Sequence, residues 1–172
     1  VISQYEENRF FECIDDLMGH QIIIRTNSHY QFAHDKIRTA LYEDLPETRK
    51  REYHLRTAWF LERQMANQKS EIEDSIIARH FSKAQEPSKS VEYSLKAAAQ
   101  AQKNQAEWEA FDHYRTAVYF LETCPNPGSD PGFQVSDFGF QSPEALLLDI
   151  YETASEFLVI AGTPFFPEYA AH

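Results

Sequence analysis

The sequence has 172 residues, a net charge of −11 and a pI of about 5.0. An acidic chain repels the phosphate backbone of nucleic acids, so this composition argues against a nucleic-acid-binding protein. The 13 Phe, 9 Tyr and 2 Trp supply enough apolar area for a sizeable core, and the length suits one ordinary domain or a small module followed by a few repeats.

The sequence also argues against a membrane or secreted protein. No apolar stretch is long enough to span a bilayer, and no signal peptide is present. The two cysteines, Cys13 and Cys124, have no disulfide-framework spacing, which is typical of reduced thiols in a cytoplasmic protein. The chain begins with Val1 inside an expected helix, so we expect it to be a piece of a larger protein.

Residues 1–45 predict a helix, a β-hairpin and a second helix. Residues 4–18 carry an apolar face and are followed by Gly19, a typical helix stop. Residues 21–26 and 29–33 favour two strands around a turn at 27–28. Asp35 then stands where a helix N-cap is expected, and the helix that follows carries an apolar stripe of Ile37, Ala40 and Leu41.

Beyond residue 45 the apolar residues recur at spacings of three and four, which predicts helices joined by short turns. Four helices are expected around residues 46–68, 72–84, 91–102 and 110–121. The small residues Ala98, Ala110 and Ala117 are expected where helices approach closely. Residues 46–124 therefore predict a series of antiparallel helical hairpins.

The remaining residues divide into a loop and a last helix. Residues 125–142 are rich in Pro, Gly and Phe, and two interpretations stay open: a mobile insertion, or a loop whose Phe133, Phe138 and Phe140 contact the helices. Ser142 is the expected N-cap of the last helix, with Pro143 at its first position. Residues 143–172 predict the first helix of a further repeat without its partner, so its apolar face is a candidate dimer contact.

One stretch resembles a known family. The pattern Phe32-x-His34-Asp35-x-Ile37-Arg38-x-Ala40-Leu41-Tyr42 is similar to the end of the winged-helix module in signal-transduction ATPases of the STAND class. In these proteins a P-loop ATPase domain precedes the winged helix, and a helical repeat array follows it. The resemblance implies that residues 1–45 are the C-terminal part of a winged helix, attached to an ATPase domain of the same chain that binds ADP or ATP.

The resemblance also implies a role for His34 and Asp35. In STAND proteins a His-Asp pair in the winged helix contacts bound ADP, so His34 would contact the terminal phosphate and Asp35 would brace the turn. The alternative is a structural histidine that hydrogen-bonds a backbone carbonyl. Arg38, one turn further along, could support either interpretation through a carboxylate partner.

The third and fourth expected helices of the 46–124 region resemble a tetratricopeptide unit. Ala98, Ala110, Tyr114 and Ala117 follow the small and aromatic pattern of that repeat. Ser94 departs from it, because a Trp or Leu is usual at that position. The resemblance implies a degenerate repeat array that binds a protein or peptide partner.

The sequence has no motif for catalysis. It lacks the Gly-x-x-x-x-Gly-Lys-Ser/Thr phosphate loop and a nucleophile elbow, and its seven histidines have no metal-ligand spacing. His54 and His80 lie on the apolar faces of their expected helices, and we expect satisfied core or inter-helix histidines there rather than ligands. Four aromatic residues are expected in the core, and any that is exposed becomes a candidate peptide anchor: Trp59, Phe60, Trp108 and Phe111.

We therefore expect a mainly α chain without enzymatic activity or a cofactor of its own. Its expected function is the regulatory and protein-interaction region of a STAND-type ATPase, with a kinase, adenylyl cyclase or transcription regulator as output. The alternative is a free-standing peptide-binding scaffold with no nucleotide link. A winged-helix DNA binder is a third possibility, supported only by Lys36, Arg38, Lys50 and Arg51.

Overall fold

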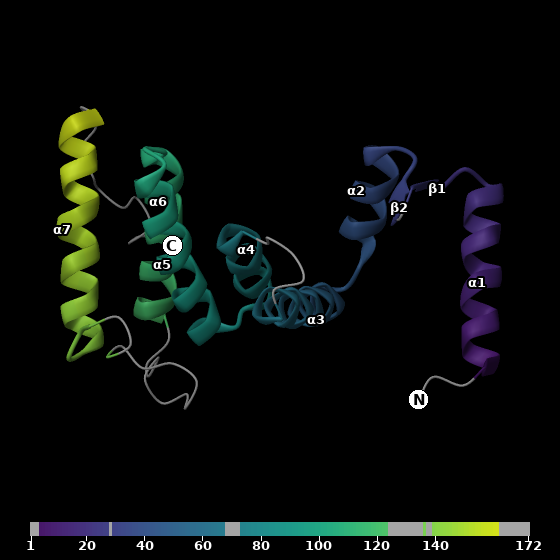
Figure 1. Cartoon of the computed structure of the whole chain (residues 1–172), viewed down its shortest axis with the longest axis horizontal. Helices are drawn as coiled ribbons and strands as arrows, with labels where there is room; N and C mark the ends of the chain where they lie inside the picture. The colour runs from purple at the N-terminus through teal and green to yellow at the C-terminus, as the bar shows by residue number, and fades with distance from the viewer. Residues whose placement is uncertain (1–3, 28, 68–72, 124–135, 137–138, 162–172) are drawn as a thin grey trace. The chain divides into compact units, whose positions relative to one another are not determined.

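The computed structural model describes residues 4–27, 29–67, 73–123, 136 and 139–161. Within these residues the fold is mainly helical, with seven helices and one two-stranded antiparallel sheet (Figure 1). The chain forms two compact units, residues 1–50 and 51–172. The expectation of a mainly α chain is therefore confirmed.

The first unit has the predicted order of helix, hairpin and helix. Helix α1 spans Gln4–Gly19, strands β1 and β2 span Ile23–Thr26 and His29–Phe32, and α2 spans Asp35–Asp44. The strands pair antiparallel, with Ile23 opposite Phe32 and Thr26 opposite His29. The turn between them includes Asn27 at a positive φ of 23°, a conformation that asparagine tolerates better than most residues.

Little of this unit is buried. Ile23 is the only buried hydrophobic residue among its described side chains. The expected apolar face of α1 is covered only in part, because Phe10 and Phe11 remain 58% and 57% exposed. In α2, Leu41 is likewise exposed and only Ile37 is half-buried. A helix that contacts only a small hairpin has too few neighbours to cover a whole apolar stripe.

Lys50 joins the start of α3 (Glu47–Ala66) to α2. Its ammonium group lies 2.7 Å from a carboxylate oxygen of Glu47, donates to the Glu43 carbonyl at 3.3 Å, and lies 5.2 Å from the centre of the Tyr42 ring. The Lys50 side chain is only 14% exposed as a result. These contacts explain why the first unit extends into the first turn of α3.

Residues 51–172 form an array of successive helices. After α3 come α4 (Asp74–Ala84), α5 (Pro87–Lys103), α6 (Glu107–Thr123) and α7 (Pro143–Ala161). Each of the helices from α4 to α7 contacts the next one along the chain (Figure 1). Ser142 caps α7 as predicted, because its hydroxyl accepts a hydrogen bond from the Ala145 N–H at 3.2 Å.

Two apolar clusters hold this array together. The first joins α3, α4 and α5 around Phe81, whose ring stacks on Tyr93 with centroids 5.6 Å apart and meets Trp59 edge-on at 5.3 Å. The second joins α5, α6 and α7 through seven buried residues: Val91, Leu95, Ala117, Phe120, Leu121, Leu146 and Ile150. Ala98, Ala110 and Ala117 are fully buried, as expected for close helix contacts.

The α4–α5 and α5–α6 turns have the same backbone conformation and hydrogen-bond pattern. Gln85 and Gln105 each adopt a left-handed conformation with φ of 59°. The N–H of each donates to a carbonyl three residues earlier, and the next N–H reaches a carbonyl five residues earlier. This hydrogen-bond pattern ends a helix and usually employs glycine.

The 125–142 segment lies mostly outside the described residues, including Phe133 and Phe138. Phe140 is described, and it contacts the cluster that joins α5, α6 and α7. The side chains expected to form the apolar face of α7 after Glu152 are also outside the described part of the chain. The candidate dimer contact depends on those side chains. At the start of α7, Leu146 is buried while Leu147 is only partly buried.

Candidate functional site

The junction between β2 and α2 holds both predicted site residues. His34 itself occupies the N-cap position, with an extended backbone (φ −139°, ψ 135°). Its carbonyl accepts hydrogen bonds from the N–H groups of Ile37 at 3.0 Å and Arg38 at 3.4 Å. The prediction that Asp35 is the N-cap is therefore wrong, because these bonds make Asp35 the first helical residue.

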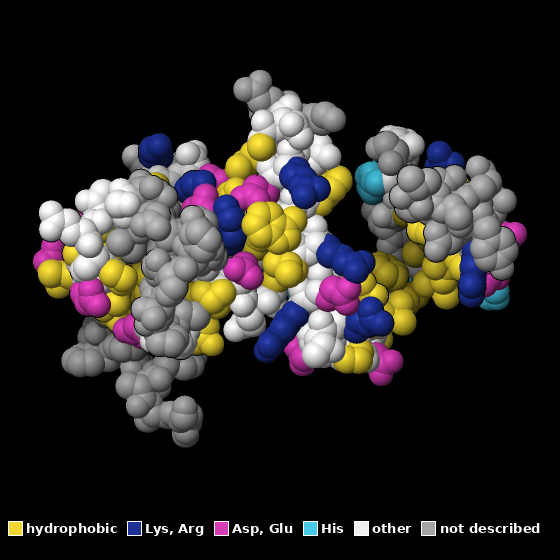
Figure 2. Space-filling view, turned by 90° about the horizontal axis from the view of Figure 1, so that it is seen from below, with side chains coloured by type: hydrophobic (Ala, Val, Ile, Leu, Met, Phe, Trp, Pro, Cys, Tyr) yellow, Lys and Arg dark blue, Asp and Glu magenta, His cyan; other side chains and the backbone are white. Residues whose placement is uncertain are grey.

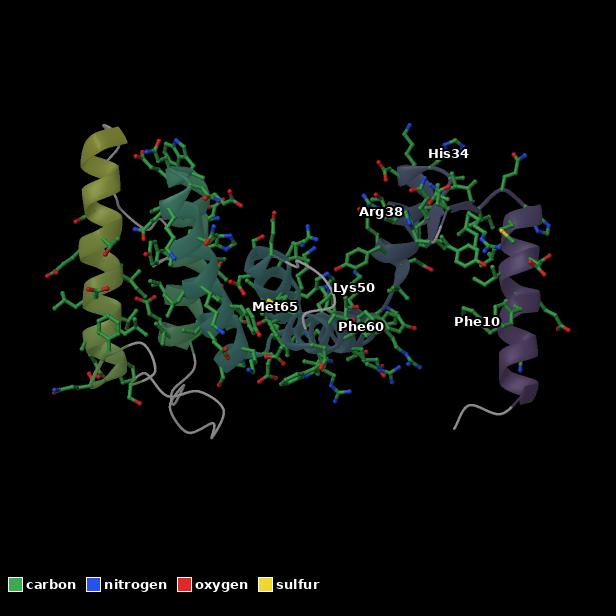
Figure 3. The ribbon with its side chains drawn as sticks, viewed as in Figure 1. Phe10, His34, Arg38, Lys50, Phe60 and Met65 are labelled. Carbon is green, nitrogen blue, oxygen red and sulfur yellow. The ribbon has the colours of Figure 1, made fainter. Side chains whose placement is uncertain are left out.

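The side chains at this junction face solvent. The Asp35 carboxylate lies 3.4 Å from the Arg38 guanidinium, a pair that is mostly exposed, and the imidazole of His34 is exposed and makes no capping hydrogen bond. Figure 3 shows His34 near the start of α2 and Arg38 further along the same helix. A helix N-terminus favours an anion, whereas the adjacent Asp35 carboxylate disfavours one.

Two of the four basic residues that would support DNA binding are occupied by other contacts. Arg38 is paired with Asp35 and Lys50 is largely buried by Tyr42 and Glu47. On the described part of the face in Figure 2, Lys and Arg side chains are interspersed with Asp, Glu and hydrophobic side chains. Binding to the phosphate backbone of DNA needs several unopposed cations on one protein surface.

His54 and His80 form a hydrogen-bonded pair between α3 and α4. Their Nδ1 atoms are 2.9 Å apart and their ring centroids 5.0 Å apart. Burial is the main cause that lowers the pKa of both imidazoles, and the positive charges of Arg79 and Lys83 act in the same direction. For His80, burial, the neighbouring His54 and these two cations together lower the pKa to about 4. The expected inter-helix role is confirmed, and within the described residues no group of three or more His, Cys, Asp or Glu is placed to hold a metal.

A groove of about 460 Å³ lies between α4 and α6, with α5 at its floor. Its polar lining comes from both walls and from one floor residue: Ser75, Arg79, Ser82 and Lys83 on α4, Glu109, Asp112, His113, Arg115 and Thr116 on α6, and Ser94 on α5. The sequence pattern alone does not predict this groove. Its one signal was Ser94, where the resembled repeat has a large residue that would fill the space.

Ser94 is the least satisfied group in the groove. It is fully buried, and its hydroxyl oxygen has no hydrogen-bond partner among the described residues. The hydroxyl of Ser90, one turn earlier on the same helix and equally buried, donates to the Glu86 carbonyl. A buried hydroxyl without a partner costs roughly 1–3 kcal/mol, so Ser94 is suited to a partner that enters the groove.

The two walls of the groove differ in charge. The charged residues on the α4 wall are both cations, Arg79 and Lys83. The charged residues on the α6 wall are Glu109 and an ion pair of Asp112 with Arg115 at 3.0 Å. Burial lowers the pKa of His113 on the α6 wall, against the raising effect of Glu109 and Asp112. His113 is therefore neutral at pH 7.

Exposed aromatic side chains lie on α6 beside the groove. Trp108 is 64% exposed and Tyr119 is 51% exposed. Together with Asp112 and Arg115 they occupy positions i, i+4, i+7 and i+11, which form one face of a helix. The core expectation is wrong for Trp108, for Phe60, which is 58% exposed, and for Trp59, which is 39% exposed although it meets the Phe81 ring. Phe111 is half-buried and contacts the Trp108 ring. Trp108 thus becomes a candidate anchor.

Comparison with protein-family models, with curated proteins and with solved structures finds no match to this chain. In the described part of the chain, no helix has the length and apolar character needed to cross a membrane.

Proposed function

We propose that this chain is a non-catalytic protein-interaction region built from tetratricopeptide-like helical hairpins. The groove between α4 and α6 carries the proposal, because it joins an unsatisfied buried hydroxyl, charged walls and exposed aromatic residues on one surface. Groove binding by an extended peptide uses these features: polar groups orient the backbone, and an aromatic residue supplies the apolar contact.

A peptide-display selection on the purified chain tests this function. Selected peptides are expected to lose binding when Ser82, on the groove wall, is replaced by Trp to fill the space, or when Trp108 is replaced by Ala. Phe60→Ala is the matched control, because Phe60 is an exposed aromatic residue on α3 that does not line the groove. Selected peptides that bind all three variants equally would refute the groove as the binding site.

The same proposal places the chain in a STAND-type signalling ATPase, as its regulatory and partner-sensing arm. Support comes from the helix–hairpin–helix order of residues 4–44 and from the solvent-facing imidazole of His34 at the start of α2. In the intact protein, His34 would donate to the terminal phosphate of ADP bound in the neighbouring ATPase domain. A free-standing scaffold without a nucleotide link is the alternative, and a phosphate loop upstream in the full-length gene would distinguish the two.

The nucleotide role has its own test in the intact protein. Removal of a charge-assisted hydrogen bond costs roughly 1.5–3 kcal/mol, so His34→Ala should speed ADP release by about ten- to a hundredfold. His29→Ala is the control, since His29 is an exposed histidine of the same hairpin. The isolated chain should show no ADP or ATP binding by calorimetry. Unchanged ADP release in His34→Ala would leave His34 as a surface residue and remove the nucleotide link.

A further inference from the structure

We propose that the segment bound in the groove is acidic, and that one of its Asp or Glu side chains is held by Arg79 on the α4 wall with Ser94 at the floor. This inference deepens the proposed function and rests on it. It is carried by three observations: the charge of the α4 wall, the unpartnered hydroxyl of Ser94, and the position of the acidic residues on the opposite wall.

Arg79 is a suitable receptor for a carboxylate. It lines the groove and makes no ion pair with any described residue, in contrast to Arg38, Arg56 and Arg115. The planar guanidinium presents donors whose spacing matches the two oxygens of a carboxylate. Lys83 lies one turn further along the same wall.

Ser94 supplies the second recognition element. Its hydroxyl is buried at the floor and has no acceptor among the described residues. Because this hydroxyl is fully buried in the free chain, side chains at the floor have to move apart before a ligand oxygen can receive its hydrogen bond. The cost of the unsatisfied donor would then be removed. A carboxylate provides several acceptor positions, so it can bind Arg79 and Ser94 together.

The opposite wall fixes the orientation of the ligand. On α6, Arg115 balances the charge of Asp112, and Glu109 remains as the negative charge that repels a carboxylate. The acidic side chain therefore belongs on the α4 wall, and the apolar part of the peptide belongs near Trp108. The whole chain has a charge of −11, which repels an acidic peptide at long range. At physiological ionic strength the screening length is about 8 Å, so the charges that line the groove dominate the bound state.

The experiment uses peptides selected from a random display library on the purified chain, each synthesised with its Asp or Glu residues and again with Asn or Gln in their place. Arg79→Gln should weaken binding of the acidic form on the order of tenfold or more, and Arg79→Lys should retain part of the affinity. Arg63→Gln is the matched control, because Arg63 is exposed on α3 and does not line the groove. Circular dichroism checks that each variant is folded.

The double-mutant cycle decides the inference. The amide form of the peptide should bind weakly to the original chain, and Arg79→Gln should weaken it little further. Independent losses from the two changes would overturn the carboxylate contact. Peptides without acidic residues that still require Trp108 and an open groove would refute this inference alone, whereas peptides that bind without the groove would refute the proposed function as well.

Discussion

The Nδ1 atoms of His54 and His80 lie 2.9 Å apart across the contact between α3 and α4. At neutral pH both imidazoles are uncharged, so one ring has an Nδ1–H group that donates a hydrogen bond to the unprotonated Nδ1 of the other ring. A second proton at this position would place two donors face to face, beside the positive charges of Arg79 and Lys83. The hydrogen bond between the two helices is therefore lost when both Nδ1 atoms carry a proton.

This pair should make the stability of the helical unit, residues 51–172, sensitive to acid. An unfolded histidine titrates near pH 6.5, whereas burial, and then the charges of His54, Arg79 and Lys83, lower the pKa of His80 to about 4. Between these values the unfolded chain binds protons that the folded chain does not. The stabilisation is therefore complete above about pH 6.5 and is lost as the pH falls towards 4.

Thermal unfolding at pH 7.5 and pH 5 checks this prediction. Tryptophan fluorescence is a specific probe, because both tryptophans, Trp59 and Trp108, belong to residues 51–172. His80→Asn should reduce the difference between the two melting temperatures. The control is His29→Asn in the hairpin, which should keep the full difference, and an equal difference in both variants would contradict the prediction.

A second prediction concerns Lys89, whose ammonium group lies 2.9 Å from carboxylate oxygens of both Glu62 and Glu92. Burial alone lowers the pKa of Lys89, but the hydrogen bonds to these two carboxylates outweigh it, and the pKa is raised. Lys89→Met would leave both half-buried carboxylates without this cation. We expect a loss of about 1–3 kcal/mol in the free energy of unfolding by urea.

Arg56→Met provides the comparison for Lys89. Arg56 pairs with Glu52 at 2.6 Å, but its side chain is 73% exposed. Exposed pairs of this kind contribute about 0.2–1 kcal/mol, so the change should be much smaller than for Lys89→Met. Similar losses for both variants would show that Lys89 acts only as a surface residue.

A third prediction compares two buried serines on α5. Ser94→Ala removes a hydroxyl without a partner among the described residues, so the unfolding free energy should stay unchanged or rise by up to about 1 kcal/mol. Ser90→Ala removes a hydrogen bond to the Glu86 carbonyl and should cost about 1 kcal/mol. Equal destabilisation by the two substitutions in a urea titration would show that Ser94 is satisfied within the protein.

A fourth prediction concerns the turn between α5 and α6. Gln105 has a φ of 59°, which costs a residue with a Cβ about 1 kcal/mol or more. Gln105→Gly should therefore stabilise the helical unit by about 0.5–1 kcal/mol. Lys103→Gly, two residues earlier and still helical, should destabilise it by a similar amount. A melting temperature that falls in both variants would contradict the prediction.

The sequence alone determined the order of the elements and much of the helical core. Periodicity placed the helices, because burial of one face requires apolar residues at spacings of three and four. The same argument marked Ala98, Ala110 and Ala117 as points of close contact, and all three are fully buried. Ser142 and Pro143 were identifiable as a helix start, since capping is a local interaction within one turn.

Only the tertiary structure decided which of these residues form a surface. Ser94 looked like an irregularity in a repeat, and Trp108 like a core residue, because a sequence does not say which neighbouring helix covers a position. The groove exists because α4 and α6 both flank α5 while Ser94 is too small to fill the space between them. Likewise, the N-cap is His34 and not the predicted Asp35, because the backbone geometry sets the first helical hydrogen bond and the preferred capping side chain does not.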